Sequence, residues 1–182
     1  MATTPLQLSG SLLLASPTLR DGIFDHSVVL VAEHSKKDGA FGVILNHPTG
    51  REVGQFLDSP EFAPLSRIPV HVGGPVAQDQ LVFAAFSQGP DNQLNFAMRL
   101  PVDQAVAKAK SPGVVVRAFI GYSGWTAGQL EGELKRDAWI TTSPDSSLPG
   151  RQHDQSLWRE LLQSISPFHR ILAEAPADPG RN

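Results

Sequence analysis

The chain has 182 residues, enough for one domain that buries about 70% of its unfolded surface without needing disulfides or metals. Its 41% hydrophobic and 18% charged residues are typical of a soluble globular protein, and the absence of cysteine excludes disulfides, thiolate metal sites and a thiol nucleophile. The 15 basic and 18 acidic residues give a formal net charge of -3, which argues against a nucleic-acid-binding protein.

The two ends of the chain bear on its location and on its domain boundaries. The stretch MATTPLQLSGSLLLASP has no charged region ahead of its short apolar run, so it does not resemble a secretory signal peptide. No stretch approaches the ~18 apolar residues of a membrane helix, so we expect a cytoplasmic protein that does not contact a membrane. We assign residues 1–172 to a single domain. Residues 173–182, AEAPADPGRN, are rich in proline, alanine and charge and are expected to form a flexible tail.

The first part of the chain predicts β-strands. Residues 11–15 form a short apolar strand, and residues 27–33, SVVLVAE, are almost continuously apolar, which indicates a strand covered on both faces. The polar turn SKKDG leads into a return strand at 40–46, so the two strands are expected to form a hairpin. Gly42 inside the return strand indicates a bulge or a close approach of another backbone.

The middle of the chain predicts a short helix followed by more strands. Val53, Phe56 and Leu57 lie at helical spacing. Residues 69–72 predict a strand that ends in the tight turn Gly73-Gly74-Pro75. We expect residues 80–86 to be its antiparallel partner and residues 95–100 to form a weaker strand.

The last part of the chain alternates helices and strands. Its amphipathic spacing predicts helices at 101–110, 126–136 and 154–165, and its apolar runs predict strands at 114–120 and 138–142. Hairpins followed by helix–strand alternation predict an α+β domain, with helices packed against one mixed sheet.

Gly124, Gly128 and Gly132 recur every four residues around the second of these helices. Each glycine inside a helix costs about 1 kcal/mol relative to alanine, so the repeat needs a reason. We interpret it as tight packing of the helix on the sheet, and the alternative is a groove for a ligand or partner. Glu131 and Lys135 are spaced as a surface ion pair.

The stretch FIGYSGWTAGQLEGEL, residues 119–134, raises the question of a nucleophile. A nucleophile elbow reads G-x-S-x-G between a strand and a helix, but Trp125 stands where the last glycine belongs. We therefore interpret the segment first as the connection between a strand and a helix, in which Ser123 and Thr126 satisfy free N–H groups at the helix start. An anion site at the same turn is the second interpretation, and a serine nucleophile is the third.

Acidic and imidazole side chains gather around the first hairpin, but their spacing matches no metal-ligand pattern. Asp21, His26, His34 and His47 fall near the strand ends, so we expect no metal. We also expect no other cofactor, because the glycine pair at 73–74 lacks the rest of a dinucleotide fingerprint. The side chain of Asn46 is predicted to hold the turn that follows it.

Unusual glycine, tryptophan and polar residues all fall at predicted strand ends, where a fold can gather a site. The leading hypothesis is a binding protein for an unknown small ligand or protein partner, with its site formed by Asp21, His34, Asn46, Gly73, Gly74, Ser123, Gly124 and Trp125. The first alternative is a hydrolase that uses Ser123 or the pair His34 and Asp21. The second is a regulator that acts directly on DNA, which the net charge of -3 disfavours. The sequence leaves the oligomeric state open.

Three separated segments resemble the AlgH/YqgE family. They are GSLLLASPTLRDGIFDHSVVLVAEHSKKDGAFGVILNHPTG, HVGGPV and GYSGWTAGQLEGEL, and Trp139 falls where this family has a tryptophan after the helix. The resemblance covers residues 7–165 and implies a bacterial cytosolic protein. It also implies one compact α+β domain with a strongly bent, partly barrel-like sheet and flanking helices. The family has been labelled a transcriptional regulator, but it has no established reaction, cofactor or catalytic residues to carry over.

Overall fold

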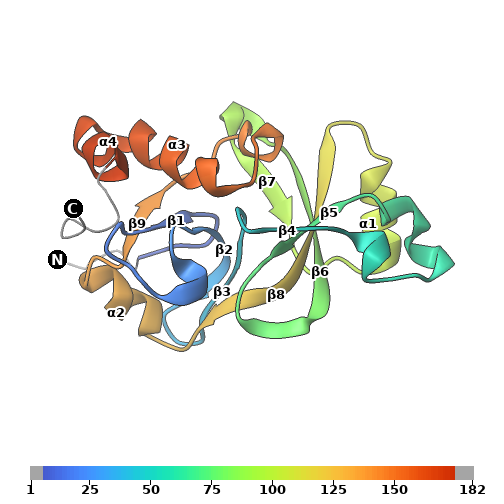
Figure 1. The fold of residues 1–182 in the computed structure, drawn as a ribbon, viewed down its shortest axis with the longest axis horizontal. Helices are drawn as coiled ribbons and strands as arrows, with labels where there is room; N and C mark the ends of the chain where they lie inside the picture. Colours follow the sequence, from blue (N-terminus) through green and yellow to red (C-terminus); the bar gives the residue numbers. More distant parts are fainter. Residues whose placement is uncertain (1–5, 175–182) are drawn as a thin grey trace.

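A computed structural model describes residues 6–174, and its centre is one curled, mixed sheet of nine strands. Along the main path the strand order is β4-β5-β8-β3-β2-β1-β9, and β6 and β7 extend from β8 as a second branch (Figure 1). The strands are β1 (Leu12–Ala15), β2 (Val28–Ser35), β3 (Gly39–Ile44), β4 (Pro48–Glu52), β5 (Pro69–Val72), β6 (Val76–Gln88), β7 (Leu94–Ala97), β8 (Val114–Trp125) and β9 (Trp139–Thr142). With its flanking helices this is the expected α+β fold.

Strands β1 to β3 are buried on both faces, as their apolar runs predict. Side chains that alternate along β2 enter two different cores, Val28 and Leu30 on one face and Val29 and Val31 on the other. The antiparallel β2–β3 hairpin is confirmed, with a register shift after Val31. A Cβ atom on Gly42 would lie 2.4 Å from the Leu30 carbonyl oxygen, so the expected close backbone approach is also present.

The long strand β8 joins the two halves of the sheet. It pairs in parallel with β5, and antiparallel with β6 along its first half and with β3 at its end. The sequence predicts that this strand stops at residue 120 and turns, which is wrong. Gly121, with a φ of +67°, bends the strand without ending it, because β3 and the first residue of β6 still pair beyond it. The predicted pairing of residues 69–72 with residues 80–86 is also wrong, because β8 lies between those two strands.

Within residues 6–174, four α-helices flank the sheet: α1 (Val102–Ala109), α2 (Gln129–Lys135), α3 (Gln155–Ile165) and α4 (Pro167–Glu174). Helix α3 covers one face of the β1–β3 layer, α2 covers the other, and α1 packs on β6 and β8 at the far end (Figure 1). Asp154 is the N-cap residue of α3, and its carboxylate accepts a hydrogen bond of 2.8 Å from the Ser156 N–H. No helix within residues 6–174 is both long and apolar enough to span a membrane.

Several local predictions need correction. The segment around Val53 forms only a 3₁₀ turn, Val53–Gln55, and the strand β4 just before it is not expected from the sequence. Helix α4 is also unexpected, because Pro167 begins a new helix after ending α3. It takes in residues 173 and 174 of the predicted tail. The remainder of that tail, 175–182, lies outside the described residues.

The four-residue glycine repeat does not lie on one helix face. Gly124 belongs to β8, Gly128 precedes α2 with a φ of +75°, and only Gly132 is inside the helix. A Cβ atom at Gly132 would meet nothing nearer than the Arg136 Nη1 at 4.0 Å, so tight packing does not explain that glycine.

We expect Gly132→Ala to raise the free energy of unfolding by about 1 kcal/mol, because alanine restricts the unfolded chain and fits the helix without a clash. Urea unfolding followed by circular dichroism measures the change. The matched control is Gly128→Ala, where the left-handed backbone makes the same substitution unfavourable. A Gly132→Ala variant that unfolds more easily than the parent would contradict the open space around this position.

Candidate functional site

The end of β8 forms a corner whose polar groups are satisfied from within the protein. Ser123 lies inside the strand rather than at a helix start, its side chain is fully buried, and its hydroxyl donates to the Gly73 carbonyl at 3.0 Å. After the strand, the N–H of Thr126 donates to the Gln129 side-chain oxygen at 3.0 Å. Ser123 therefore holds two loops together, and its hydroxyl is not presented to solvent as a nucleophile.

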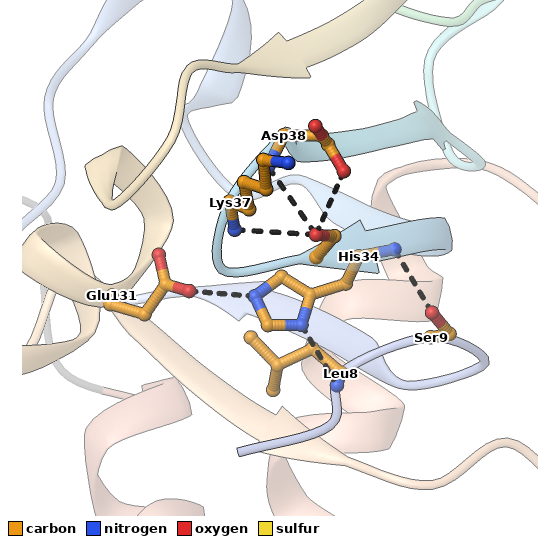
Figure 2. A network of polar contacts seen from close by, with 7 residues as sticks. Leu8, Ser9, His34, Lys37, Asp38 and Glu131 are labelled. Atoms are coloured by element: carbon orange, nitrogen blue, oxygen red, sulfur yellow. Dashed lines mark hydrogen bonds and ion pairs between the residues drawn. The ribbon is translucent and has the colours of Figure 1, made fainter. Parts of the chain in front are cut away.

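His34, on β2, fastens α2 to the hairpin (Figure 2). Its Nε2 lies 2.8 Å from the Glu131 Oε1, and its side chain is only 2% exposed. The Leu8 N–H donates to Nδ1 at 3.4 Å, so Nδ1 carries no proton and Nε2 is the donor toward Glu131. Burial alone would raise the pKa of Glu131, but hydrogen bonds from its own backbone and from His34 outweigh it and hold the pKa below its usual value. Glu131 thus pairs with His34 and not, as expected, with Lys135.

Glu133, two residues further along α2, accepts hydrogen bonds from two indoles. Trp125 Nε1 and Trp139 Nε1 donate to the same oxygen, Oε2, at 2.9 and 2.8 Å. The other oxygen accepts from the Gln129 side chain at 3.1 Å. The two indole rings stand edge to face with centroids 6.3 Å apart. The acidic residues of the signature GQLEGEL therefore fix α2 to the sheet.

A cleft of about 540 Å³ opens between the tip of the β2–β3 hairpin and the end of β8, and we call it the hairpin cleft. Phe41 and Tyr122 form an aromatic pair in its wall, with ring centroids 5.0 Å apart. The guanidinium of Arg99 lies 3.7 Å above the Phe41 ring and 3.6 Å from the Glu33 carboxylate. The lining comprises Glu33, His34, Ser35, Asp38, Gly39, Ala40, Phe41, Val76, Arg99, Tyr122, Gly124, Trp125 and Thr126.

A second cleft of about 390 Å³ adjoins it, and we call it the tryptophan cleft. It lies between α2 and the loops before β2 and β6, and Trp125 and Trp139 both line it. Both clefts include Gly124 and Trp125, so these two residues form the wall between them. The lining comprises Leu19, Asp21, Phe24, Pro75, Gly124, Trp125, Gln129, Glu133, Arg136, Ala138 and Trp139.

The structure brings most of the predicted site residues to this corner. His34, Gly124 and Trp125 line the hairpin cleft, whereas Asp21 lines the tryptophan cleft. His34 and Asp21 thus line different clefts, and His34 already pairs with Glu131. The predicted catalytic pair is therefore not formed.

The two glycines of HVGGPV have a structural reason to be glycine. A Cβ atom on Gly73 would lie 2.4 Å from the Gly121 carbonyl oxygen, and one on Gly74 would lie 2.1 Å from the Tyr122 carbonyl oxygen. Both glycines are buried beneath the corner, and neither lines a cleft described above. They let two backbones approach closely, which sets the position of Tyr122.

Asn46 lies apart from the other predicted site residues. It is fully buried just beyond β3, where its Oδ1 accepts from the Val28 N–H at 2.8 Å and its Nδ2 donates to the His26 carbonyl at 2.9 Å. It lines a separate cleft of about 790 Å³ together with Asp25, His47 and the residues that begin α3. Asn46 thus ties neighbouring loops together at a distance from the Trp125 corner.

Sequence reasoning did not single out Phe41, Tyr122 or Arg99, although all three line the hairpin cleft. An aromatic residue two positions after the predicted SKKDG turn was a signal for Phe41. Tyr122 was assigned to a turn, so its pairing with Phe41 could not be anticipated. Arg99 follows β7 and reaches the cleft only through the tertiary fold, with a left-handed φ of +54°.

No set of three or more histidine and carboxylate side chains within residues 6–174 is arranged to hold a metal ion. The buried histidines His71 and His153 have backbone partners instead. The His71 Nε2 donates to the His153 carbonyl at 3.0 Å, and the His153 Nε2 donates to the Leu148 carbonyl at 2.9 Å. Burial lowers the pKa of both, and the nearby Arg117 guanidinium lowers it further. These imidazoles therefore remain neutral and structural.

Comparison with known proteins identifies relatives along nearly the whole chain. A UPF0301 protein of Mycobacterium tuberculosis is 37% identical over 96% of this chain and 90% of its own length. The UPF0301 protein SCO2948 of Streptomyces coelicolor is 34% identical, with 96% and 95% covered. A UPF0301 protein of Parabacteroides distasonis is 33% identical, with 97% and 92% covered. The similarity thus extends well beyond the three signature segments.

Solved structures match the fold as well. The solution structure of the AlgH protein from Pseudomonas aeruginosa superposes with a TM-score of 0.67 and 26% identity, covering 97% of this chain and 98% of that one. The crystal structure of protein DIP2367 from Corynebacterium diphtheriae has a TM-score of 0.72 and 24% identity, with 93% of each chain covered, and shows the same fold. The profile of the family described as AlgH-like matches residues 12–168, so the chain belongs to the AlgH-like family.

Proposed function

We propose that the protein is a non-catalytic binding protein and that the hairpin cleft is its binding site. The observation that carries the proposal is the state of the polar groups around this cleft. His34, Ser35 and Trp125 donate to carboxylates of the protein itself, whereas the half-buried Tyr122 ring and the exposed side chains of Arg99 and Glu33 are accessible to a ligand. Polar groups that are hydrogen-bonded within the protein fix the shape of a site, and exposed aromatic and charged groups recognise the ligand.

Catalysis has less support at this corner. A general base must accept a proton from the substrate, but Nδ1 of His34 accepts from Leu8 and its Nε2 donates to Glu131. A serine nucleophile must be exposed and activated, but Ser123 is buried and donates to a carbonyl. Neither Ser123 as a nucleophile nor His34 as a general base therefore supports the hydrolase alternative.

Arg99 is the recognition group that the geometry favours most. Its guanidinium stacks on Phe41, which orients its N–H donors without consuming them. The ion pair with Glu33 joins two side chains that are 55% and 66% exposed, so a ligand can displace it at small cost. A non-glycine residue with a φ of +54° costs about 1 kcal/mol, and the stacking on Phe41 helps to offset that strain.

The test is a titration of the ¹⁵N-labelled protein with the amides of lysine, arginine, phenylalanine and glutamate. We expect at least one probe to shift the amide signals of Gly39, Phe41 and Gly124 selectively. Arg99→Gln should change that affinity by about threefold or more, because it removes the stacked charge. Arg159→Gln on α3, an exposed arginine outside the clefts, is the matched control and should have no effect. If no probe shifts the cleft signals, the hairpin cleft is not a binding site.

A further inference from the structure

Gly124 forms the exposed part of the wall between the hairpin cleft and the tryptophan cleft. Trp125, the other shared residue, is only 6% exposed, whereas Gly124 is open to solvent. A ligand that enters both clefts must therefore pass over the Gly124 backbone. A side chain at this position would stand in its path.

The fold does not require a glycine at position 124. Its φ is not in the left-handed region, and a Cβ atom would meet only the Tyr122 ring at 3.5 Å, an ordinary contact. The neighbouring Gly121 differs, because a Cβ atom there would lie 2.6 Å from the Gly74 carbonyl oxygen. A glycine inside a strand weakens it, and one without an internal reason marks a place where another backbone or a ligand comes close.

The rims of the two clefts carry more acidic than basic side chains. Glu33 and Asp38 face Arg99 in the hairpin cleft, and Asp21 and Glu133 face Arg136 in the tryptophan cleft. Because the Glu133 carboxylate already accepts from Trp125, Trp139 and Gln129, three carboxylates stand against two guanidinium groups across the pair of clefts. The aromatic walls formed by Phe41, Tyr122 and the two tryptophans favour apolar groups and cations.

We infer that the two clefts together bind an extended polypeptide segment that carries basic side chains and crosses the Gly124 ridge. This inference rests on the proposed function and extends it from the hairpin cleft to both clefts. Side chains on one face of an extended chain recur at about 7 Å, so one segment can place successive side chains on either side of a bare backbone ridge. A glycine at the ridge allows the main chains to approach closely, and the acidic rim selects lysine and arginine.

The test uses capped hexapeptides in which lysine and phenylalanine alternate, with the glutamate–phenylalanine counterpart and lysine amide as comparisons. Binding to the full-length protein is measured by intrinsic tryptophan fluorescence and by calorimetry. We expect the lysine hexapeptide to bind about tenfold or more tightly than either comparison, and added NaCl to weaken it. Gly124→Val should reduce the affinity for the hexapeptide by about tenfold and the affinity for lysine amide by less, because only the hexapeptide must cross the ridge.

Gly150→Val is the matched control, because a Cβ atom there meets nothing within 4 Å and the residue lies far along the chain in the loop before α3. If Gly124→Val does not fold, Gly124→Ala replaces it, with an expected loss of about threefold. If the hexapeptide and lysine amide bind with equal affinity, and the substitution of Gly124 changes neither affinity, the inference is wrong. A small-ligand site in the hairpin cleft would then remain. Binding of neither would overturn the proposed function as well.

Discussion

Gly39→Ala is expected to lower the free energy of unfolding by about 3 kcal/mol or more, one of the largest effects of any substitution in this chain. Gly39 begins β3 with a φ of +96°, and a Cβ atom there would lie 2.0 Å from the Trp125 carbonyl oxygen. That oxygen belongs to the pair Ala40 and Trp125, the last rung between β3 and β8. The methyl group would push the hairpin tip away from β8 and open the hairpin cleft.

Gly50→Ala separates the two causes of this loss. Gly50 also has a left-handed φ, +74°, but a Cβ atom there would meet nothing within 4 Å. We expect Gly50→Ala to cost only the backbone strain, about 1 kcal/mol. Urea unfolding of both variants by circular dichroism gives the comparison. Equal losses in the two variants would show that the Trp125 contact contributes nothing.

Stability is expected to fall as the pH drops from about 6.5 to about 4, because His153 must remain neutral in the fold. Burial, with a smaller effect from Arg117, lowers the pKa of His153 from 6.5 to about 4. Its Nδ1 is buried and has no hydrogen-bond partner among the described residues, so burial opposes the addition of a proton there. Between these two pH values the unfolded chain binds a proton that the folded chain does not. The loss amounts to about 3 kcal/mol.

Measuring the free energy of unfolding by urea at several pH values across this window tests the prediction. His153→Gln, which cannot titrate but can still donate to Leu148, should flatten most of the slope. Burial also lowers the pKa of His71 and of His47, so a smaller slope of the same sign should remain. His169→Gln on α4 is the control, because that half-buried histidine bonds to Ser166 within its own helix turn. A parent protein whose stability is flat from pH 6.5 to 4 would show that His153 carries no such penalty.

Local sequence patterns were sufficient to predict the elements whose conformation is encoded by neighbouring residues. The apolar run of β2, the polar turn after it and the amphipathic stripe of α3 predict these elements within a few residues of their observed bounds. The course of β8 beyond Gly121 was not predictable, because glycine and serine favour a turn unless a partner strand holds them extended. That partner is β3, which is distant in the sequence, so the outcome depended on tertiary pairing rather than on propensity.

The candidate site shows the same division. Gly124, Trp125 and His34 stood out by residue type, and they do line one corner of the molecule. The contacts that define the corner are the His34–Glu131 pair and the Arg99–Phe41 stack, which join distant segments. No periodicity along the chain encodes such contacts, because they arise only once the sheet has curled and α2 has docked.

The course of β8 also has a consequence for how the molecule responds to force, heat and ligands. Strand β8 is hydrogen-bonded to β5, β6 and β3. If one half of the sheet unfolds, the other half therefore loses backbone hydrogen bonds as well. The two halves accordingly form one cooperative unit. We expect a ligand bound at the Trp125 end of this strand to stabilise the distant α1 end as well, and slower amide hydrogen exchange there would report it.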